Sequence, residues 1–293
     1  MSLIDFLQTT FPERFSGRRL YHYSKPEVLE RFFADDADMY CTYYAALNDS
    51  HEVVEGWDAV ATYMEDVVGM SQDRIAILKN GYRELFYQDV SSPWIMSFSE
   101  DRDSLPQWSM YSDHSRGGYA FGFDRDNLAE RVVKLMSAPK NQSCPFDMWL
   151  TPCFYDVESL QRIFDFYFNK HHRVVERFAS AGKLAKEDVD AFLNIVSVIA
   201  VMVKQGSFKS EREWRLVKFP HGQMFETCEF VGGKPRHRTE LFNPQSPLRN
   251  SVKEIVISPH GDRNMLNVNA AIMAMKYHLC IDVTDSGSSY NGR

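Results

Sequence analysis

The sequence predicts an α+β fold, with a β-sheet core interrupted by a helical insertion. Two observations support this class. Short runs rich in tyrosine, phenylalanine and valine, bounded by turn residues, lie on both sides of a long segment with helical periodicity. These strands and helices follow one another without the regular βαβ alternation of a doubly wound parallel sheet. The length of 293 residues, with 44% hydrophobic and 25% charged residues, fits one elaborated globular domain.

The N-terminal part of the chain is predicted to run from strand to helix and back to strand. Ser24 and Pro26 follow the first β-like run and give a favourable helix start, and Asn48-Asp49 is a turn signal that ends the second strand. The helical spacing of apolar residues then begins. The expected elements are strands at 18–24 and 38–49, a helix at 27–33 and a helical segment at 52–88.

The remainder of the chain places the helical insertion between two groups of strands. The insertion, residues 157–205, is predicted to hold two or three helices with a break at Ser180-Ala181-Gly182. Strands are expected at 93–101, 117–124, 149–158, 208–219, 226–232, 238–242, 252–258 and 280–285, and further helices at 105–114 and 265–278. Together these elements form a single domain, 1–285, followed by a flexible polar tail, 286–293.

The composition indicates a cytoplasmic protein that neither spans a membrane nor binds zinc. A net charge of −7 provides no general attraction for nucleic acid, and the first residues lack the features of a secretion signal. The most apolar stretch, 192–203, contains Asn194 and Ser197 and is too short to cross a bilayer, so a buried helix is expected there. The five cysteines are scattered without a CxxC pair, which is typical of reduced thiols.

A pair of glutamates is the first candidate for chemistry. Glu211 and Glu213 lie two apart in the segment FKSEREWRL, and on a strand they would share one face. Two like charges on one face repel each other unless a cation, water or ligand lies between them. The sequence leaves two explanations open: an exposed edge strand that carries charge for solubility, or an acid/base pair at a site.

Three further segments offer candidate side chains. His22 lies in a strand between two tyrosines, where it is either a packed core histidine or a ligand-binding group. Ser97 and Ser99 share one strand face and can donate to a ligand or to a carboxylate. Residues 108–123 combine Tyr111 and Arg116 with a glycine pair; this pair opens a strand and no Lys-Ser/Thr follows it, so it is not a phosphate-binding loop.

The order of these blocks is more specific than any one of them. The chain reads LYHYS, LNDSHE, IMSFSE, WSMYSDH, GFD and EREWR in succession. This resembles a large bacterial family that shares a domain of unknown function, with blocks LYHY, FNDP-E, CFS, MW-HYA, G-IGFD and E-EWR. The resemblance extends over residues 18–262. The chain departs from it at Ser50, where proline is usual, and in the block around Tyr111.

The same order also resembles an ADP-ribosyltransferase, an enzyme that splits NAD and transfers its ADP-ribose. Such enzymes carry His or Arg on an early strand, S-x-S or Tyr on a central strand, and a late Glu, often as E-x-E. Here His22, Ser97-Phe98-Ser99 or Tyr111, and Glu211-Arg212-Glu213 stand in that order. The resemblance implies a split mixed β-sheet, NAD as the substrate and no metal.

The resemblance also implies a role for each residue. Glu213 would stabilise the oxocarbenium-like ribose, and Glu211 would orient or deprotonate the acceptor. His22 would hold the adenosine ribose or a phosphate, and Tyr111 would stack on nicotinamide. The full NAD-binding set is His22, Tyr23, Ser97, Ser99, Tyr111, Arg116 and Arg215, with Arg116 or Arg215 pairing with the pyrophosphate.

The acceptor implied by this class is a macromolecule, either protein or nucleic acid. A bacterial toxin or phage-defence effector of this kind would have a neutralising antitoxin as a partner. Two other classes stay open. One is a metal-dependent phosphodiesterase or nuclease that binds Mg²⁺ through Asp49, Glu52, Glu211 and Glu213. The other is a non-catalytic ligand-binding module that keeps the site without turnover.

Overall fold

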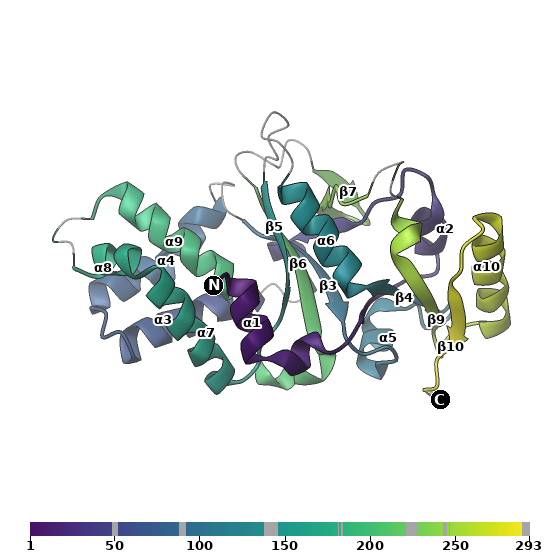
Figure 1. Cartoon of the computed structure of the whole chain (residues 1–293), viewed down its shortest axis with the longest axis horizontal. Coiled ribbons are helices and arrows are strands. Elements are labelled where there is room, and N and C mark those ends of the chain that lie inside the picture. Colours follow the sequence, from purple (N-terminus) through teal and green to yellow (C-terminus); the bar gives the residue numbers. More distant parts are fainter. Residues whose placement is uncertain are drawn as a thin grey trace.

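The α+β prediction is confirmed by the computed structural model of the chain, in which one mixed β-sheet is flanked by helices (Figure 1). The structure describes residues 1–48, 52–87, 92–137, 146–180, 182, 184–220, 228–242, 245 and 247–288. Within these residues the sheet has ten strands. They are β1 Arg19–Ser24, β2 Tyr40–Tyr43, β3 Trp94–Ser99, β4 Tyr119–Asp124, β5 Phe146–Pro152, β6 Glu213–Pro220, β7 Glu229–Val231, β8 Lys234–Arg238, β9 Val252–Ile257 and β10 Asp282–Asp285.

Most neighbouring strands in the sheet are antiparallel. The path runs β10-β9-β4-β1-β3-β2-β8-β7, and β6 lies beside β3 with β5 on its far side. The pair β9–β10 is parallel, which makes the sheet mixed. Two of the longest ladders, β3–β6 and β5–β6, place the start of β6 in the interior, so side chains at that point are shielded from water.

The central strand β3 is where the sheet forks. Along one edge, β6 pairs with all of Trp94–Ser99. Along the other edge, β2 pairs with Trp94 and Ile95, whereas β1 pairs with Ser99. Ser97 therefore lies between the two partners, at a point where neither β1 nor β2 continues the ladder.

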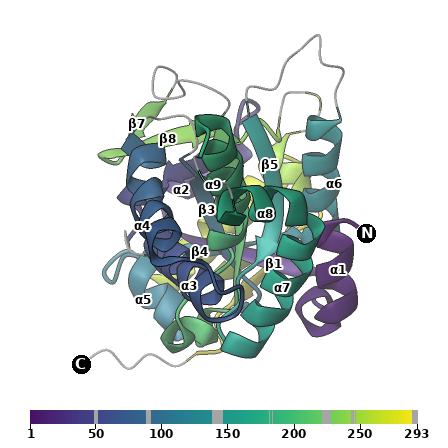
Figure 2. The same cartoon turned by 90° about the vertical axis from the view of Figure 1, so that its left-hand side faces the viewer.

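Helices cover the β5–β6 side of the sheet in a compact group (Figures 1 and 2). The group consists of α3 Glu52–Asp66, α4 Gln72–Tyr87, α7 Val157–Lys170, α8 His172–Ser180 and α9 Lys186–Ala200, with α1 Leu3–Thr10 beside it. The predicted insertion thus appears as α7, α8 and α9. Gly56 allows α3 to approach α9, because a Cβ there would lie 2.0 Å from the carbonyl oxygen of Ala200.

The opposite side of the sheet is covered by α2 Val28–Phe33, α6 Arg125–Met136 and α10 Arg263–Lys276, which pack on a second apolar core. A short helix, α5 Leu105–Tyr111, packs on a smaller cluster formed by Tyr21, Tyr23 and Trp108. Two of the helices, α1 and α6, were not predicted from the sequence.

The segment that carries the two glutamates differs from its prediction. Glu211 ends a 3₁₀ helix, Gly206–Glu211, and β6 begins only at Glu213. Between them Arg212 adopts a left-handed backbone conformation with φ 47°. The expectation of one continuous strand through both carboxylates was therefore wrong, because this turn re-aims the chain before the strand begins.

Other boundaries also moved. The segment 52–88 divides into α3 and α4 at Gly69, whose φ is +72°. The strand expected at 238–242 lies instead at Lys234–Arg238, as β8. In the predicted tail, Ser286 Oγ donates to Asp103 at 2.5 Å, and the backbone of Gly287 and Ser288 donates to the same carboxylate. Residues 289–293 lie outside the described part of the chain.

The apolar stretch 192–203 lies mostly in α9, as predicted. Phe192, Leu193, Val196 and Ile199 are all buried in the core on the helical side. Among the residues that the structure describes, no helix has both the length and the apolar character needed to cross a membrane.

Candidate functional site

The carboxylates of Glu211 and Glu213 form ion pairs with two cations, Lys204 and Arg215. Lys204 Nζ lies 2.5 Å from Glu211 Oε2 and 2.6 Å from Glu213 Oε2. Arg215 Nε donates to Glu213 Oε1 at 3.0 Å. All four residues are buried, with exposed fractions of 4% for Lys204, 7% for Glu211, 3% for Glu213 and 0% for Arg215. We call these four residues the charge quartet; its formal charges sum to zero.

The quartet is assembled by the end of α9, the left-handed turn and the start of β6. After α9, the chain runs beside Phe154, which receives a hydrogen bond from Lys204 N and donates to Met202 O. Arg215 Nη1 also donates to Val201 O at 2.8 Å. Main-chain hydrogen bonds to Phe154 and the side chain of Arg215 on β6 therefore hold the segment 201–204, and Lys204 Nζ lies between the two carboxylates.

Ser97 joins the quartet to the fork of the sheet. Its Oγ donates to Glu213 Oε1 at 2.6 Å. The sequence expectation that these strand hydroxyls serve a neighbouring carboxylate thus holds for Ser97. Burial alone would raise the pKa of Glu213, but Arg215 and Lys204 outweigh it and hold the pKa at about 2. Glu213 is therefore an anion at neutral pH, unable to act as a general acid.

His22 reaches the same serine from the other side of the fork. Its Nδ1 lies 3.0 Å from Ser97 O, and because a carbonyl only accepts, Nδ1 carries the proton. Burial lowers the pKa of His22 to about 4, although the bond to Ser97 opposes this shift. The imidazole is therefore neutral at pH 7, and its Nε2 is a hydrogen-bond acceptor. His22, Ser97 and Glu213, far apart in sequence, thus form one hydrogen-bonded series.

Ser99 and Tyr23 serve the main chain near this series. Ser99 Oγ donates to Glu211 O at 2.6 Å and accepts from Asp101 N at 3.0 Å. Tyr23 donates its hydroxyl proton to Asp101 O and accepts from Ser104 N. Both hydroxyls fix the turn after β3, and neither bond leads to a ligand.

The remaining predicted residues are distributed between the core and the surface. Tyr111 is half-buried against the cluster of Tyr21, Tyr23 and Trp108. Arg116 is exposed and pairs with Asp113 at 2.9 Å. Arg215 is wholly buried within the charge quartet. Both arginines expected to bind pyrophosphate are therefore already paired with carboxylates in this structure.

The sequence analysis missed Lys204, the cation that both carboxylates share. The available signal was its position directly after the apolar stretch 192–203, since a lysine there is either drawn inward to a partner or left at a helix end. It also missed Glu100, which accepts from Arg14, Arg212 and Trp214 and closes the turn beside the quartet.

Of the four residues considered as magnesium ligands, the structure describes the side chains of Glu211 and Glu213 alone. Asp49 and the side chain of Glu52 lie outside the described residues. Between Glu211 and Glu213, the ammonium group of Lys204 occupies the position that a cation would take. In the part of the chain that the structure describes, no group of three or more His, Cys, Asp and Glu side chains is arranged to hold a metal ion.

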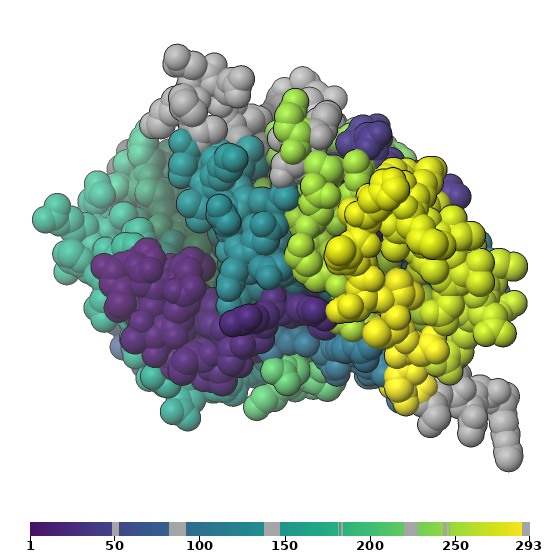
Figure 3. Space-filling model, turned by 45° about the vertical axis from the view of Figure 1, so that its right-hand side comes forward, coloured from purple at the N-terminus to yellow at the C-terminus, as the bar shows by residue number. Residues whose placement is uncertain are grey.

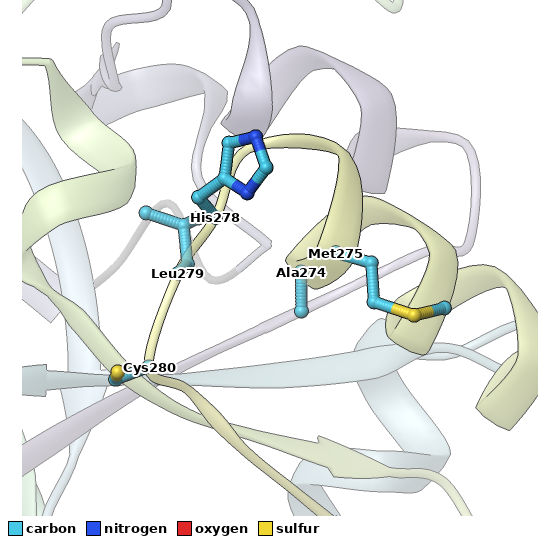
Figure 4. Close-up of a pocket in the computed structure, with 5 residues that line it drawn as sticks. All are labelled: Ala274, Met275, His278, Leu279 and Cys280. Carbon is cyan, nitrogen blue, oxygen red and sulfur yellow. The ribbon is translucent and has the colours of Figure 1, made fainter.

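A surface pocket lies elsewhere, at the C-terminal end of α10 (Figure 4). It is lined by Ala274, Met275, His278, Leu279 and Cys280, and none of these belongs to the predicted site. Helix α10 also exposes an apolar stripe, and the C-terminal part of the chain that contains this helix is coloured yellow-green to yellow in Figure 3. The stripe consists of Met265, Val268, Ile272 and Met275.

Comparison with protein families matches residues 107–216 to a family described as a protein of unknown function (DUF2971). The expected resemblance to a domain of unknown function is confirmed over this range, which is less than half of the chain. The range contains the whole charge quartet but not His22 or Ser97. Comparisons with curated proteins and with solved structures found no match.

Proposed function

We propose that the protein is an ADP-ribosyltransferase-like enzyme that cleaves NAD and transfers ADP-ribose to a macromolecule, either protein or nucleic acid. The observation that supports this proposal is the series His22–Ser97–Glu213, in which one serine bonds the neutral histidine through its carbonyl and the anionic glutamate through its hydroxyl. It joins the early-strand, central-strand and late-strand motifs at the fork.

The protonation states suit this chemistry. Cleavage of the nicotinamide–ribose bond develops positive charge on the ribose, and an anion held beside it stabilises that charge. Glu213, with a pKa of about 2, stays ionised throughout the neutral range. His22 Nε2, as an acceptor, suits a ribose hydroxyl better than a phosphate oxygen, because both the nitrogen and the phosphate oxygen lack a proton to donate. Glu211, which forms an ion pair with the same Lys204, would orient the acceptor.

One observation favours a second candidate, a ligand-binding module without turnover. Both oxygens of Glu213 are already engaged: Oε1 accepts from Ser97 and Arg215, and Oε2 from Lys204 and Arg215. Since the quartet is neutral, an oxocarbenium ion would gain from Glu213 only if the ribose displaced part of this network. A protein that binds NAD without displacing it would not catalyse the reaction.

The two candidates separate in a direct assay. Purified protein incubated with NAD should release nicotinamide, detected by liquid chromatography, and the rate should not respond to a chelator. His22→Ala should raise the KM for NAD, and Ser97→Ala should lower kcat. Glu158→Gln, which removes an exposed glutamate from the first turn of α7, is the control and should change neither.

The outcomes are distinct. NAD binding without nicotinamide release identifies the binding module, and neither binding nor release rejects the proposal. Chelator-sensitive cleavage of nucleic acid would favour the phosphodiesterase class instead. If nicotinamide is released, labelled NAD added to cell lysate, followed by mass spectrometry, identifies the acceptor as a protein or a nucleic acid. A toxin or defence role with a neutralising partner then predicts that expression of the active protein arrests growth.

A further inference from the structure

The side chain of Arg236, on β8, forms no hydrogen bond or ion pair with the described residues. Its Nε is buried and has no hydrogen-bond acceptor, and the described residues provide it with no ion pair. Its neighbour Arg238, two residues along the strand, is different: it donates to Glu229 at 3.0 Å. A guanidinium group has five donors in a fixed fork, so burying part of it without an acceptor is unfavourable unless a ligand supplies one.

The strand register places Arg236 near the fork of the sheet. Arg236 pairs with Thr42 on β2, and Thr42 pairs with Ile95 on β3. Cross-strand partners share a face, and so do residues two apart on a strand. Arg236 and Ser97 therefore project from the same face, with Ser97 two residues beyond Ile95. Glu213 shares this face too, because its partner on β3 is Ser99.

The surroundings of Arg236 are positively charged. Arg31 lies on α2 next to Phe32, whose ring stacks with His22 at 6.3 Å between centroids. Burial and then the charge of Arg31 lower the pKa of Arg236. Burial and then the charge of Arg236 lower the pKa of Lys234. Among the described residues, no carboxylate forms an ion pair with Arg31, Lys234 or Arg236, although the net charge of the chain is −7. Such an arrangement is stabilised by a bound anion.

We propose that Arg236 binds the phosphate groups of a nucleotide at the fork of the sheet, with the positive charge of Arg31 adding to the attraction. A planar guanidinium group matches the oxygens of a phosphate, and the positive surroundings favour a diphosphate over a single charge. The diphosphate thus falls to Arg236, not to Arg116 or Arg215, which already have carboxylate partners.

The site deepens the proposed function, and its identification with the NAD diphosphate rests on that function. Phosphate binding itself does not. Titration calorimetry on the full chain at fixed salt uses ADP, inorganic pyrophosphate and adenosine as probes. We expect ADP and pyrophosphate to bind, and Arg236→Gln to weaken both by about tenfold or more while leaving adenosine unchanged. Arg238→Gln is the matched control: it removes the same charge from the same strand and should alter affinity by less than about twofold.

A second variant tests whether the planar shape of the guanidinium group matters for binding. Arg236→Lys keeps the charge but loses the planar fork, so its affinity for ADP should be intermediate. The melting temperature of each variant without ligand shows whether it is folded. The proposal is overturned if ADP and pyrophosphate fail to bind, or if Arg238→Gln loses as much affinity as Arg236→Gln, which would indicate a diffuse charge effect.

The two proposals fail in different ways. If Arg236→Gln weakens ADP binding but the protein releases no nicotinamide from NAD, the phosphate site stands and the transferase does not. If NAD is cleaved and Arg236→Gln leaves its KM unchanged, the transferase stands and the assignment of the NAD diphosphate to Arg236 is rejected.

Discussion

Buried charge is neutralised by ion pairs in the charge quartet, whereas the described residues around Arg236 leave its charge unpaired. In the quartet, Lys204 and Arg215 face Glu211 and Glu213 at hydrogen-bonding distances, and the charges cancel. On β8, Arg236 has a buried donor without an acceptor. A balanced cluster is complete within the chain, whereas an unbalanced one is completed by something that binds. The comparison separates charge that neighbouring side chains neutralise from charge that they do not.

The largest effect should come from breaking the balance of the quartet. Lys204→Met removes the cation that both carboxylates share and leaves an uncompensated buried charge, so the free energy of unfolding should fall by about 3–5 kcal/mol. Urea denaturation measures this. Lys209→Met, an exposed lysine in the next turn, is the control and should leave stability unchanged. A Lys204→Met protein as stable as the unchanged one would show that the quartet is not a stabilising unit.

Acid should weaken the same cluster. The pKa of Glu213 is about 2 in the folded protein against an ordinary value of 4.5, so its contribution is complete above pH 4.5 and is lost as the pH falls toward 2. The shift corresponds to about 3 kcal/mol. Unfolding free energies between pH 6 and pH 2.5 should show this decline, and Glu213→Gln should flatten it. An equally steep decline in Glu213→Gln would assign the acid sensitivity to other groups.

A smaller effect should follow from loosening the link between the quartet and the fork. Ser97→Ala removes a 2.6 Å hydrogen bond to an ionised carboxylate, but Arg215 and Lys204 still hold Glu213. The expected loss is about 1–2 kcal/mol of unfolding free energy. Ser109→Ala, at an exposed position on α5, is the control. If Ser97→Ala costs nothing, Ser97 does not hold the glutamate in place.

The smallest effect, with the opposite sign, should come from the unbalanced cluster. Arg236→Gln removes a cation that faces other cations, so without ligand the protein should be unchanged or more stable by up to about 1 kcal/mol. The melting temperature without and with ADP checks this, because ADP should stabilise the unchanged protein more than the variant. Strong destabilisation by Arg236→Gln would mean that Arg236 serves the fold.

Local patterns predicted most of the strands and the members of the central series. His22, Ser97 and Glu213 lie on strands rich in aromatic and other apolar residues, so the strands and their order could be recognised from the sequence. The left-handed conformation of Arg212 was not, because a non-glycine residue gives no local signal for it.

The residues that decide the electrostatics could not be predicted. Lys204 meets Glu211 and Glu213 because α9 ends against Phe154 in the folded chain, a packing relation without a trace in the local pattern. Arg236 was passed over because the strand was assigned to 238–242, four residues beyond the start of β8. Cancellation of charge is a property of three-dimensional neighbours, and sequence spacing reveals it only within one element.

The fork at β3 has a mechanical consequence. The strands β1, β4, β9 and β10 form one wing of the sheet and β2, β8 and β7 another, and both attach to the same edge of β3 without pairing with each other. In the described ladder the first wing is registered to β3 through Tyr21 and Ser99, and the His22 ring supplies the next link in place of a backbone amide. A central strand is ordinarily the most slowly exchanging part of a sheet. Here the two wings meet at the middle of β3 without pairing with each other. We therefore expect a change of the angle between them to strain the Tyr21–Ser99 pair and the His22–Ser97 hydrogen bond before it disrupts the longer ladders.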